Sequence, residues 1–159
     1  MIVLPPPLLK QIVDASEAAY PEECCGLIVG RFQAPDQALA TRLAVSDNVS
    51  TNDRRQRFEI DPRVRLRVEM EVRGGSERVI GVYHSHPDHR AQPSSRDLSM
   101  AFEPDLIWII ASVMDGQAIQ VTAHALNANG QQFHEIPLHT DDWAPYAIRG
   151  ETGDGADGP

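Results

Sequence analysis

Apolar and polar positions follow two different periods along the chain, and each change of period separates a helix from strands. Residues 5–19 place apolar side chains at helical spacing, behind prolines that a first helical turn tolerates. Residues 95–102 predict a second, short helix, and residues 58–60 predict a short strand. Continuous or alternating apolar runs predict the remaining strands, over residues 24–32, 39–45, 78–84, 106–113, 117–125 and 131–137. One β-rich sheet with a few helices is typical of the α+β class.

Residues 62–73 carry two conflicting signals. Their apolar side chains alternate strictly with polar ones, which is the period of a strand, at Val64, Leu66, Val68, Met70 and Val72. Pro62 follows Asp61, however, and an acid before a proline is typical of a helix N-cap and its first turn. We therefore predict a helix here, which Gly74-Gly75 would end.

Length and composition indicate one globular domain. The chain has 159 residues, which suits a single domain, and 42% of them are apolar and 23% charged. We place the domain at residues 1–139. An acidic, glycine-rich tail follows over residues 140–159, and its last ten residues should be disordered.

The charge balance argues against two classes of partner. With 14 basic and 23 acidic residues the net charge is −9, which disfavours binding to nucleic acid or to an anionic membrane. The acids within the arginine-rich residues 54–78 suggest a salt-bridged, solvated face there. The longest apolar runs are about half of what spans a bilayer.

The two cysteines, Cys24 and Cys25, are adjacent in the sequence. Neighbours in an extended segment point to opposite faces, so we expect no disulfide between them. The first residues do not resemble a secretory leader, and we expect a reducing, cytoplasmic location.

Two histidines and one acid within residues 81–97 have the spacing of metal ligands. His84 and His86 lie two apart at the end of a predicted strand, so their side chains leave the same face. Asp97 lies in the first turn of the next predicted helix. Two nitrogens and one carboxylate oxygen make the ligand count of a catalytic zinc site, which keeps its fourth position open for water. Ser94-x-x-Asp97 also fits a helix capping box, but after His-x-His we favour metal ligation by Asp97.

The pattern of these residues resembles that of a known family. His84-Ser85-His86, followed after seven residues by Ser94-x-x-Asp97, resembles the signature of the JAMM (MPN-plus) metalloproteases. The segment PEECCGLIVG at residues 21–30 is similar to the other sequence block of that family. The likeness is greatest to compact bacterial and archaeal members. It implies a single-domain MPN-type (cytidine-deaminase-like) fold, with a mixed sheet flanked by about three helices.

The resemblance also implies a cofactor and roles for the site residues. One zinc ion per chain would be held by His84, His86 and Asp97. Glu23 would move the proton between the attacking water and the leaving amine. Ser94 would donate a hydrogen bond to the developing oxyanion, although helix capping competes for the same hydroxyl.

The choice of Glu23 over its neighbour has a basis in the backbone as well. If Glu22 and Glu23 are extended, their side chains point in opposite directions, so only one of them can point toward the metal. The resemblance favours Glu23, which stands three residues before Gly26.

The function implied is a zinc-dependent peptidase or isopeptidase. It would hydrolyse the bond after the C-terminal Gly-Gly of a ubiquitin-like or sulfur-carrier protein. Two alternatives are a non-catalytic MPN scaffold with a vestigial metal and a zinc amidohydrolase acting on another substrate. Nothing in the sequence indicates an oligomeric state.

Overall fold

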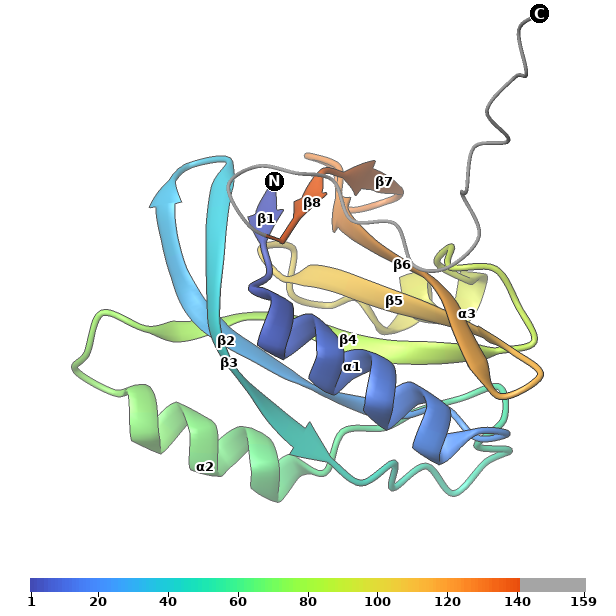
Figure 1. Ribbon diagram of the computed structural model, residues 1–159. Coiled ribbons are helices and arrows are strands. Elements are labelled where there is room, and N and C mark those ends of the chain that lie inside the picture. Colours follow the sequence, from blue (N-terminus) through green and yellow to red (C-terminus); the bar gives the residue numbers. More distant parts are fainter. Residues whose placement is uncertain (141–159) are drawn as a thin grey trace, which may run out of the picture.

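Eight strands form one mixed sheet in the computed structural model, which describes residues 1–140 (Figure 1). The strand order is β7-β6-β5-β4-β2-β3-β1-β8. The strands are β1 (Ile2–Val3), β2 (Cys25–Ala34), β3 (Gln37–Ser46), β4 (Arg78–Pro87), β5 (Ile107–Met114), β6 (Gln117–Leu126), β7 (Phe133–Ile136) and β8 (Leu138–His139). The helices are α1 (Pro6–Ala19), α2 (Pro62–Val72) and α3 (Ser95–Met100). A mixed sheet with three helices agrees with the α+β prediction.

The topology brings the end of β4 beside the beginning of β2. β4 lies at the centre of the sheet, parallel to β5 and antiparallel to β2. In this register His84 of β4 lies opposite Cys25, the first residue of β2. Glu23, which precedes β2, therefore reaches the same edge of the sheet as the last residues of β4.

Each face of the sheet has its own hydrophobic core. Helix α1 packs Leu9 and Ile12 against one face, while α2 packs Val68 against the other. Cys24 belongs to the first core and Cys25 to the second. The two thiols thus point to opposite faces, and within residues 1–140 both are free, as expected.

Helix α2 explains the conflicting pattern of residues 62–73. Asp61 caps it, because its side chain accepts a hydrogen bond from the backbone nitrogen of Arg63 at 2.9 Å. Residues two apart on a helix differ in direction by about 200°, so strict alternation divides the apolar side chains between opposite faces. Val68 is accordingly buried, whereas Leu66 and Met70 are each 62% exposed.

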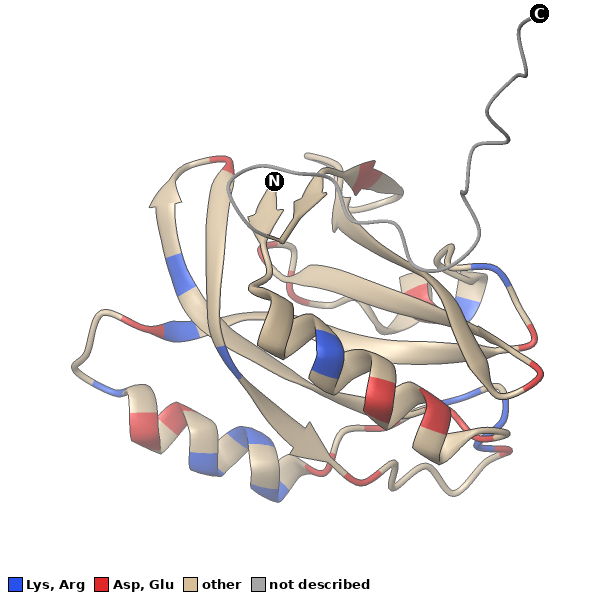
Figure 2. Cartoon of the chain, in the orientation of Figure 1, with Lys and Arg blue, Asp and Glu red and all other residues tan. Residues whose placement is uncertain are grey.

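Ion pairs cover the outer face of α2, where basic and acidic residues lie together (Figure 2). Arg65 contacts Glu69 at 2.8 Å, and Arg42 of β3 contacts Glu71 at 2.7 Å. This agrees with a salt-bridged, solvated face for the arginine-rich segment.

Two parts of the chain differ from the predictions, and a third lies mostly outside the residues that the structure describes. Strands β1 and β8 were not predicted, because each is two residues long and carries no periodic signal. Residues 58–60 contribute a single bridge, between Asn48 and Ile60, rather than a strand. The predicted tail lies almost wholly outside the described residues.

Among the helices described, none combines the length and hydrophobicity needed to cross a membrane.

Candidate metal centre

The last residues of β4 place two imidazoles on one side of the sheet. His84 and His86 are both buried, and their Nε2 atoms lie 3.0 Å apart. Ser85 points to the opposite side, where its Oγ accepts a hydrogen bond from the backbone nitrogen of Cys24 at 2.8 Å. The i, i+2 alternation of a strand therefore produces the pair of imidazoles, as the spacing predicted.

Asp97 takes part in a capping box and contacts both histidines as well. Its backbone nitrogen donates to Ser94 Oγ at 3.1 Å, and its Oδ2 accepts from the Ser94 backbone nitrogen at 2.8 Å. Oδ1 lies 3.2 Å from His84 Nε2, and Oδ2 lies 3.2 Å from His86 Nε2. The two interpretations of Asp97 are compatible, because the cap orients the carboxylate toward the imidazoles.

The three side chains have the spacing that a zinc ion requires. Ligand atoms about 2.0–2.1 Å from a tetrahedral ion lie about 3.3 Å from one another. The separations of 3.0 and 3.2 Å among His84, His86 and Asp97 are close to that value. The residues present thus fit the metal that the sequence pattern suggested.

Glu23 is the second carboxylate of the site. It is only 5% exposed, and its Oε2 has no hydrogen-bond partner within residues 1–140. One of its oxygens lies within 4.8 Å of ligand nitrogens of both His84 and His86. By that distance Glu23 could itself be grouped with the histidines as a ligand. We favour Asp97 as the ligand because its oxygens touch both imidazoles, whereas neither histidine forms an ion pair with Glu23 in the described chain.

The neighbouring acid faces elsewhere. Glu22 is half-buried and lies 3.5 Å from Arg54, outside the group formed by Glu23 and the histidines. The structure thus brings Glu23, rather than Glu22, to the site, which is the choice made from the sequence.

Burial and charge set the protonation of these groups. Burial raises the pKa of Glu23 to about 8. Burial also lowers the pKa of His84, which favours the neutral imidazole that a metal needs. Burial would raise the pKa of Asp97, but His84 and His86 hold it well below its usual range.

Contacts outside the ligand set fix the imidazole rings. His86 Nδ1 lies 2.9 Å from the backbone oxygen of Arg90, so a proton on Nδ1 leaves Nε2 free as a ligand. The ring of His84 stacks on Phe58 with 4.4 Å between centroids, and Trp108 meets it edge-on at 5.7 Å. Phe58 belongs to the segment predicted as a strand, and no sequence signal pointed to its contact with a site histidine.

Ser94 caps α3, and among residues 1–140 its hydroxyl hydrogen has no acceptor. Its Oγ accepts a hydrogen bond from the Asp97 nitrogen, and a serine hydroxyl keeps its own hydrogen when it accepts. Ser94 is exposed and lines the same pocket as Glu23 and His86. Capping and hydrogen-bond donation therefore do not compete for the hydroxyl, contrary to the expectation from the sequence.

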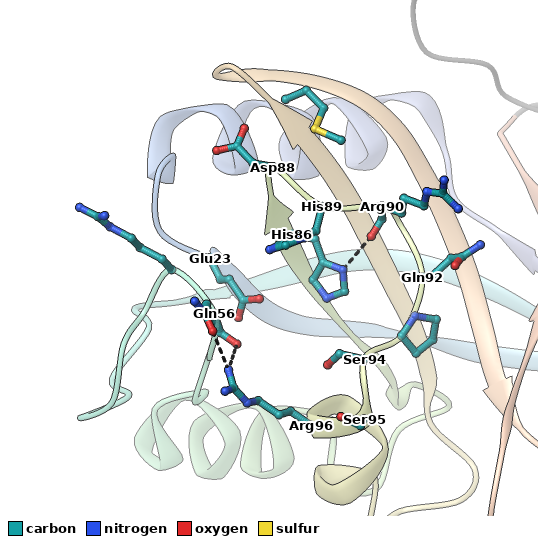
Figure 3. Close-up of a pocket in the computed structure, with 13 residues that line it drawn as sticks. Glu23, Gln56, His86, Asp88, His89, Arg90, Gln92, Ser94, Ser95 and Arg96 are labelled. Carbon is teal, nitrogen blue, oxygen red and sulfur yellow. Dashed lines mark hydrogen bonds between the residues drawn. The ribbon is translucent and has the colours of Figure 1, made fainter.

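A pocket of about 730 Å³ opens in front of these residues (Figure 3). Its inner lining includes the buried Glu23 and His86, and the exposed Ser94 lines it as well. Three arginines also line it, together with Gln56, at positions Arg55, Arg90 and Arg96. No sequence pattern singled out these four residues, since they lie in loops or in the first turn of a short helix.

This fold and this site define a class of protein. Two histidines lie at the end of a central strand, with one acid from the following helix and a second acid just before the adjacent strand, and such a group could hold a metal ion. The chain matches the family of prokaryotic homologs of the JAB domain over residues 5–126, and it belongs to that family.

Curated relatives support the assignment. The chain is 29% identical over 131 residues to a desampylase of Haloferax volcanii, which covers 82% of this chain and 87% of the relative. It is 25% identical over 115 residues to a CysO-cysteine peptidase of Mycobacterium tuberculosis, which covers 72% of this chain and 75% of the relative. The predicted hydrolase of peptide or isopeptide bonds is thereby confirmed as a class, and these relatives disfavour a non-catalytic scaffold.

Solved structures confirm the fold. A protein of Desulfitobacterium hafniense aligns with a TM-score of 0.72 and 27% identity, covering 89% of this chain and 94% of that one. A JAB1/MPN domain protein of Archaeoglobus fulgidus aligns with a TM-score of 0.52 and 22% identity, covering 84% and 93%. The MPN-type architecture predicted from the sequence is therefore correct.

Proposed function

We propose that this chain is a zinc-dependent peptidase that cleaves after the C-terminal Gly-Gly of a ubiquitin-like or sulfur-carrier protein. One observation carries the proposal: the Nε2 atoms of His84 and His86 lie 3.0 Å apart and each lies 3.2 Å from one oxygen of Asp97, beside a buried Glu23 oxygen that has no partner in the described chain. His84, His86 and Asp97 would hold the zinc. When bound, zinc supplies Lewis acidity, which lets water react as a nucleophile near neutral pH.

Glu23 is the group that handles protons in this proposal. It lies near both imidazoles without contacting them, which leaves room for a water molecule between the carboxylate and the ligands. Glu23 accepts the proton of the attacking water and delivers it to the leaving nitrogen. General acid–base catalysis of this kind contributes about 10²–10⁴-fold to the rate.

Ser94 stabilises the charge that develops on the carbonyl oxygen. Its Oγ is held in place by the Asp97 nitrogen, and its hydrogen remains available to the oxyanion. Because the hydroxyl is already oriented by the cap, little reorganisation is needed during the reaction.

The names of the relatives support the substrate class. One relative is a desampylase and another acts on CysO-cysteine. A glycine-terminated tail suits such a site, because an extended tail without side chains can enter a narrow channel and pair with a strand edge. A cytoplasmic location fits the two free cysteines of the described chain.

Cleavage of defined carriers tests this function. A β-grasp sulfur carrier and ubiquitin, each extended by one alanine beyond Gly-Gly, are incubated with the zinc-loaded protein and weighed by mass spectrometry. We expect at least one of them to lose the alanine, and we expect a chelator or a final Gly→Val change in the carrier to block the loss. Cleavage that ignores the valine, or that occurs only on short unstructured peptides, would exclude the Gly-Gly assignment. A carbonyl substrate of another kind, cleaved in place of both carriers, would instead support the amidohydrolase alternative.

A further inference from the structure

The outer part of the site pocket carries three arginines and one acid, Asp88, although the chain as a whole has a net charge of −9. Arg55, Arg90 and Arg96 line it, and none of the three forms an ion pair with an acid of residues 1–140. Five other arginines are each paired with a carboxylate: Arg42, Arg54, Arg63, Arg65 and Arg67. Within residues 1–140, Arg31, Arg57, Arg73 and Arg78 also form no ion pair, but they do not line this pocket. An arginine without an ion pair can bind a carboxylate through its planar fork of donors, and three such arginines line the pocket in front of the candidate metal centre.

Arg96 is the arginine that the structure holds in position. Its Nη1 donates to the backbone oxygen of Gln56 at 3.3 Å and to Gln56 Oε1 at 3.2 Å. Figure 3 shows this guanidinium below Glu23 and reaching across to Gln56, whereas the guanidinium of Arg90 is directed away from them. Arg55 makes no side-chain hydrogen bond or ion pair among the described residues. Arg96 therefore offers its remaining N–H donors with the least loss of side-chain freedom.

The position of Arg96 relative to Glu23 identifies which part of a substrate it meets. Glu23 delivers a proton to the leaving nitrogen, so that nitrogen must lie beside its carboxylate. In a C-terminal amino acid, the carbon attached to this nitrogen also carries the free α-carboxylate. A cation close to Glu23 can therefore bind that carboxylate. The side chains of Arg96 and Glu23 line the same pocket, and Figure 3 shows the Arg96 guanidinium below Glu23.

An isopeptide-linked lysine offers no such partner. Its leaving nitrogen is at the end of the side chain, and its α-carbonyl lies a full side-chain length away within a peptide bond. Arg96 would then remain unpaired in the complex with substrate.

We propose that Arg96 binds the terminal α-carboxylate of the leaving residue, so that the enzyme acts as a carboxypeptidase on a Gly-Gly-Xaa carrier. The inference rests on the proposed function and names the substrate class for it. Water adds its oxygen to the carbonyl carbon of the last glycine, the carbon–nitrogen bond breaks, and a proton passes to the departing nitrogen. The products are a carrier ending in Gly-Gly and one free amino acid.

Three forms of one carrier test the proposal, built on whichever carrier is cleaved in the assay above. The first ends in Gly-Gly-Ala with a free carboxylate, the second in the same residues with a terminal carboxamide, and the third is joined to a lysine side chain. We expect kcat/KM of the natural enzyme for the free acid to exceed that for the carboxamide by about tenfold to 100-fold, the range for a hydrogen bond to a charged group. The isopeptide should be cleaved no better than the carboxamide.

Variants then assign the preference to one side chain. Arg96→Gln should lose most of the preference for the acid while its kcat/KM on the carboxamide stays near that of the natural enzyme. Retained carboxamide cleavage also shows that this variant is folded and holds its metal. Arg96→Lys should keep part of the preference, since it keeps the charge but not the planar fork. Arg73→Gln, which removes an exposed arginine outside the pocket, should change nothing.

The outcomes distinguish failure of the role of Arg96 from failure of the proposed peptidase function. If the natural enzyme cleaves acid and carboxamide equally, or cleaves the isopeptide faster, the role of Arg96 is wrong and the peptidase function stands. An equal loss on all three substrates in Arg96→Gln would also overturn the role. If no carrier is cleaved by the natural enzyme, the function and the inference fail together.

Discussion

The inner and outer parts of the pocket are built in different ways. At its inner end lie His84, His86 and Asp97, of which His86 lines the pocket; all three are no more than 6% exposed and are fixed by strand register and a helix cap. The outer part, which includes Gln56 and Arg96, consists of exposed side chains on a loop and a short helix. In the proposed function, the reaction chemistry would therefore depend on the core of the fold, whereas substrate choice would depend on exposed residues that can change without disturbing that core.

This difference predicts a gradient of mutational effects. Changes in the inner part should abolish metal binding or turnover for every substrate. Changes in the outer part should alter the ratio between substrates, by the smaller factor given above for Arg96→Gln.

The largest effect is expected for His86→Ala. Removing one ligand nitrogen should cost most of the bound zinc, and kcat/KM should fall by more than about 1,000-fold because metal catalysis supplies several kcal/mol. Metal content per chain is measured by elemental analysis, alongside cleavage of the carrier. His134→Ala, on exposed residue 134 of β7, is the matched control and should keep both properties. Full zinc content in His86→Ala would contradict the ligand assignment.

The next effect separates proton transfer from metal binding. Glu23→Gln keeps the size of the side chain but cannot accept a proton, so turnover should drop by roughly 10²–10⁴-fold. Its zinc content should stay close to that of the natural protein, because Glu23 is not assigned as a ligand. Glu22→Gln is the control. If Glu22→Gln slows the reaction instead, the assignment of the two acids is reversed. If Glu23→Gln loses its metal, Glu23 is a ligand.

Ser94 lies between the two parts of the pocket and should show an intermediate effect. Ser94→Gly removes the hydroxyl donor, and turnover should fall by about 10²–10³-fold. Glycine is nearly as good as serine at an N-cap, so the free energy of unfolding should fall by only a few tenths of a kcal/mol. Ser94→Thr keeps a hydroxyl and should restore most of the rate. Turnover that follows only the stability of these variants would reduce Ser94 to a helix cap.

The sequence was most informative where one local rule decided the outcome. The i, i+2 spacing of His84 and His86 was sufficient to place both imidazoles on one face. Asp61 before Pro62 correctly overruled an alternating pattern that favoured a strand. In each case, neighbours within a few residues determine the geometry.

Features that depend on contacts between distant segments could not be predicted in this way. Gln56 meets Arg96 across 40 positions of sequence, and Phe58 stacks on His84 only because the loop folds over the end of β4. Neither Gln56 nor Phe58 lies in a periodic pattern that would have placed it. The sequence also could not show that the Ser94 hydroxyl keeps its hydrogen, because this depends on its oxygen accepting from the Asp97 nitrogen.

The backward-facing Ser85 has a consequence for anyone who wishes to transplant this site. Its hydroxyl holds the backbone of Cys24, which directly follows Glu23, so the acid and the imidazoles are joined through the rear of the sheet. A designer who copied only the five reactive side chains onto another scaffold would omit this connection. The smallest portable unit is the end of β4, the start of β2 and the serine that joins them, together with the capped helix that supplies Asp97.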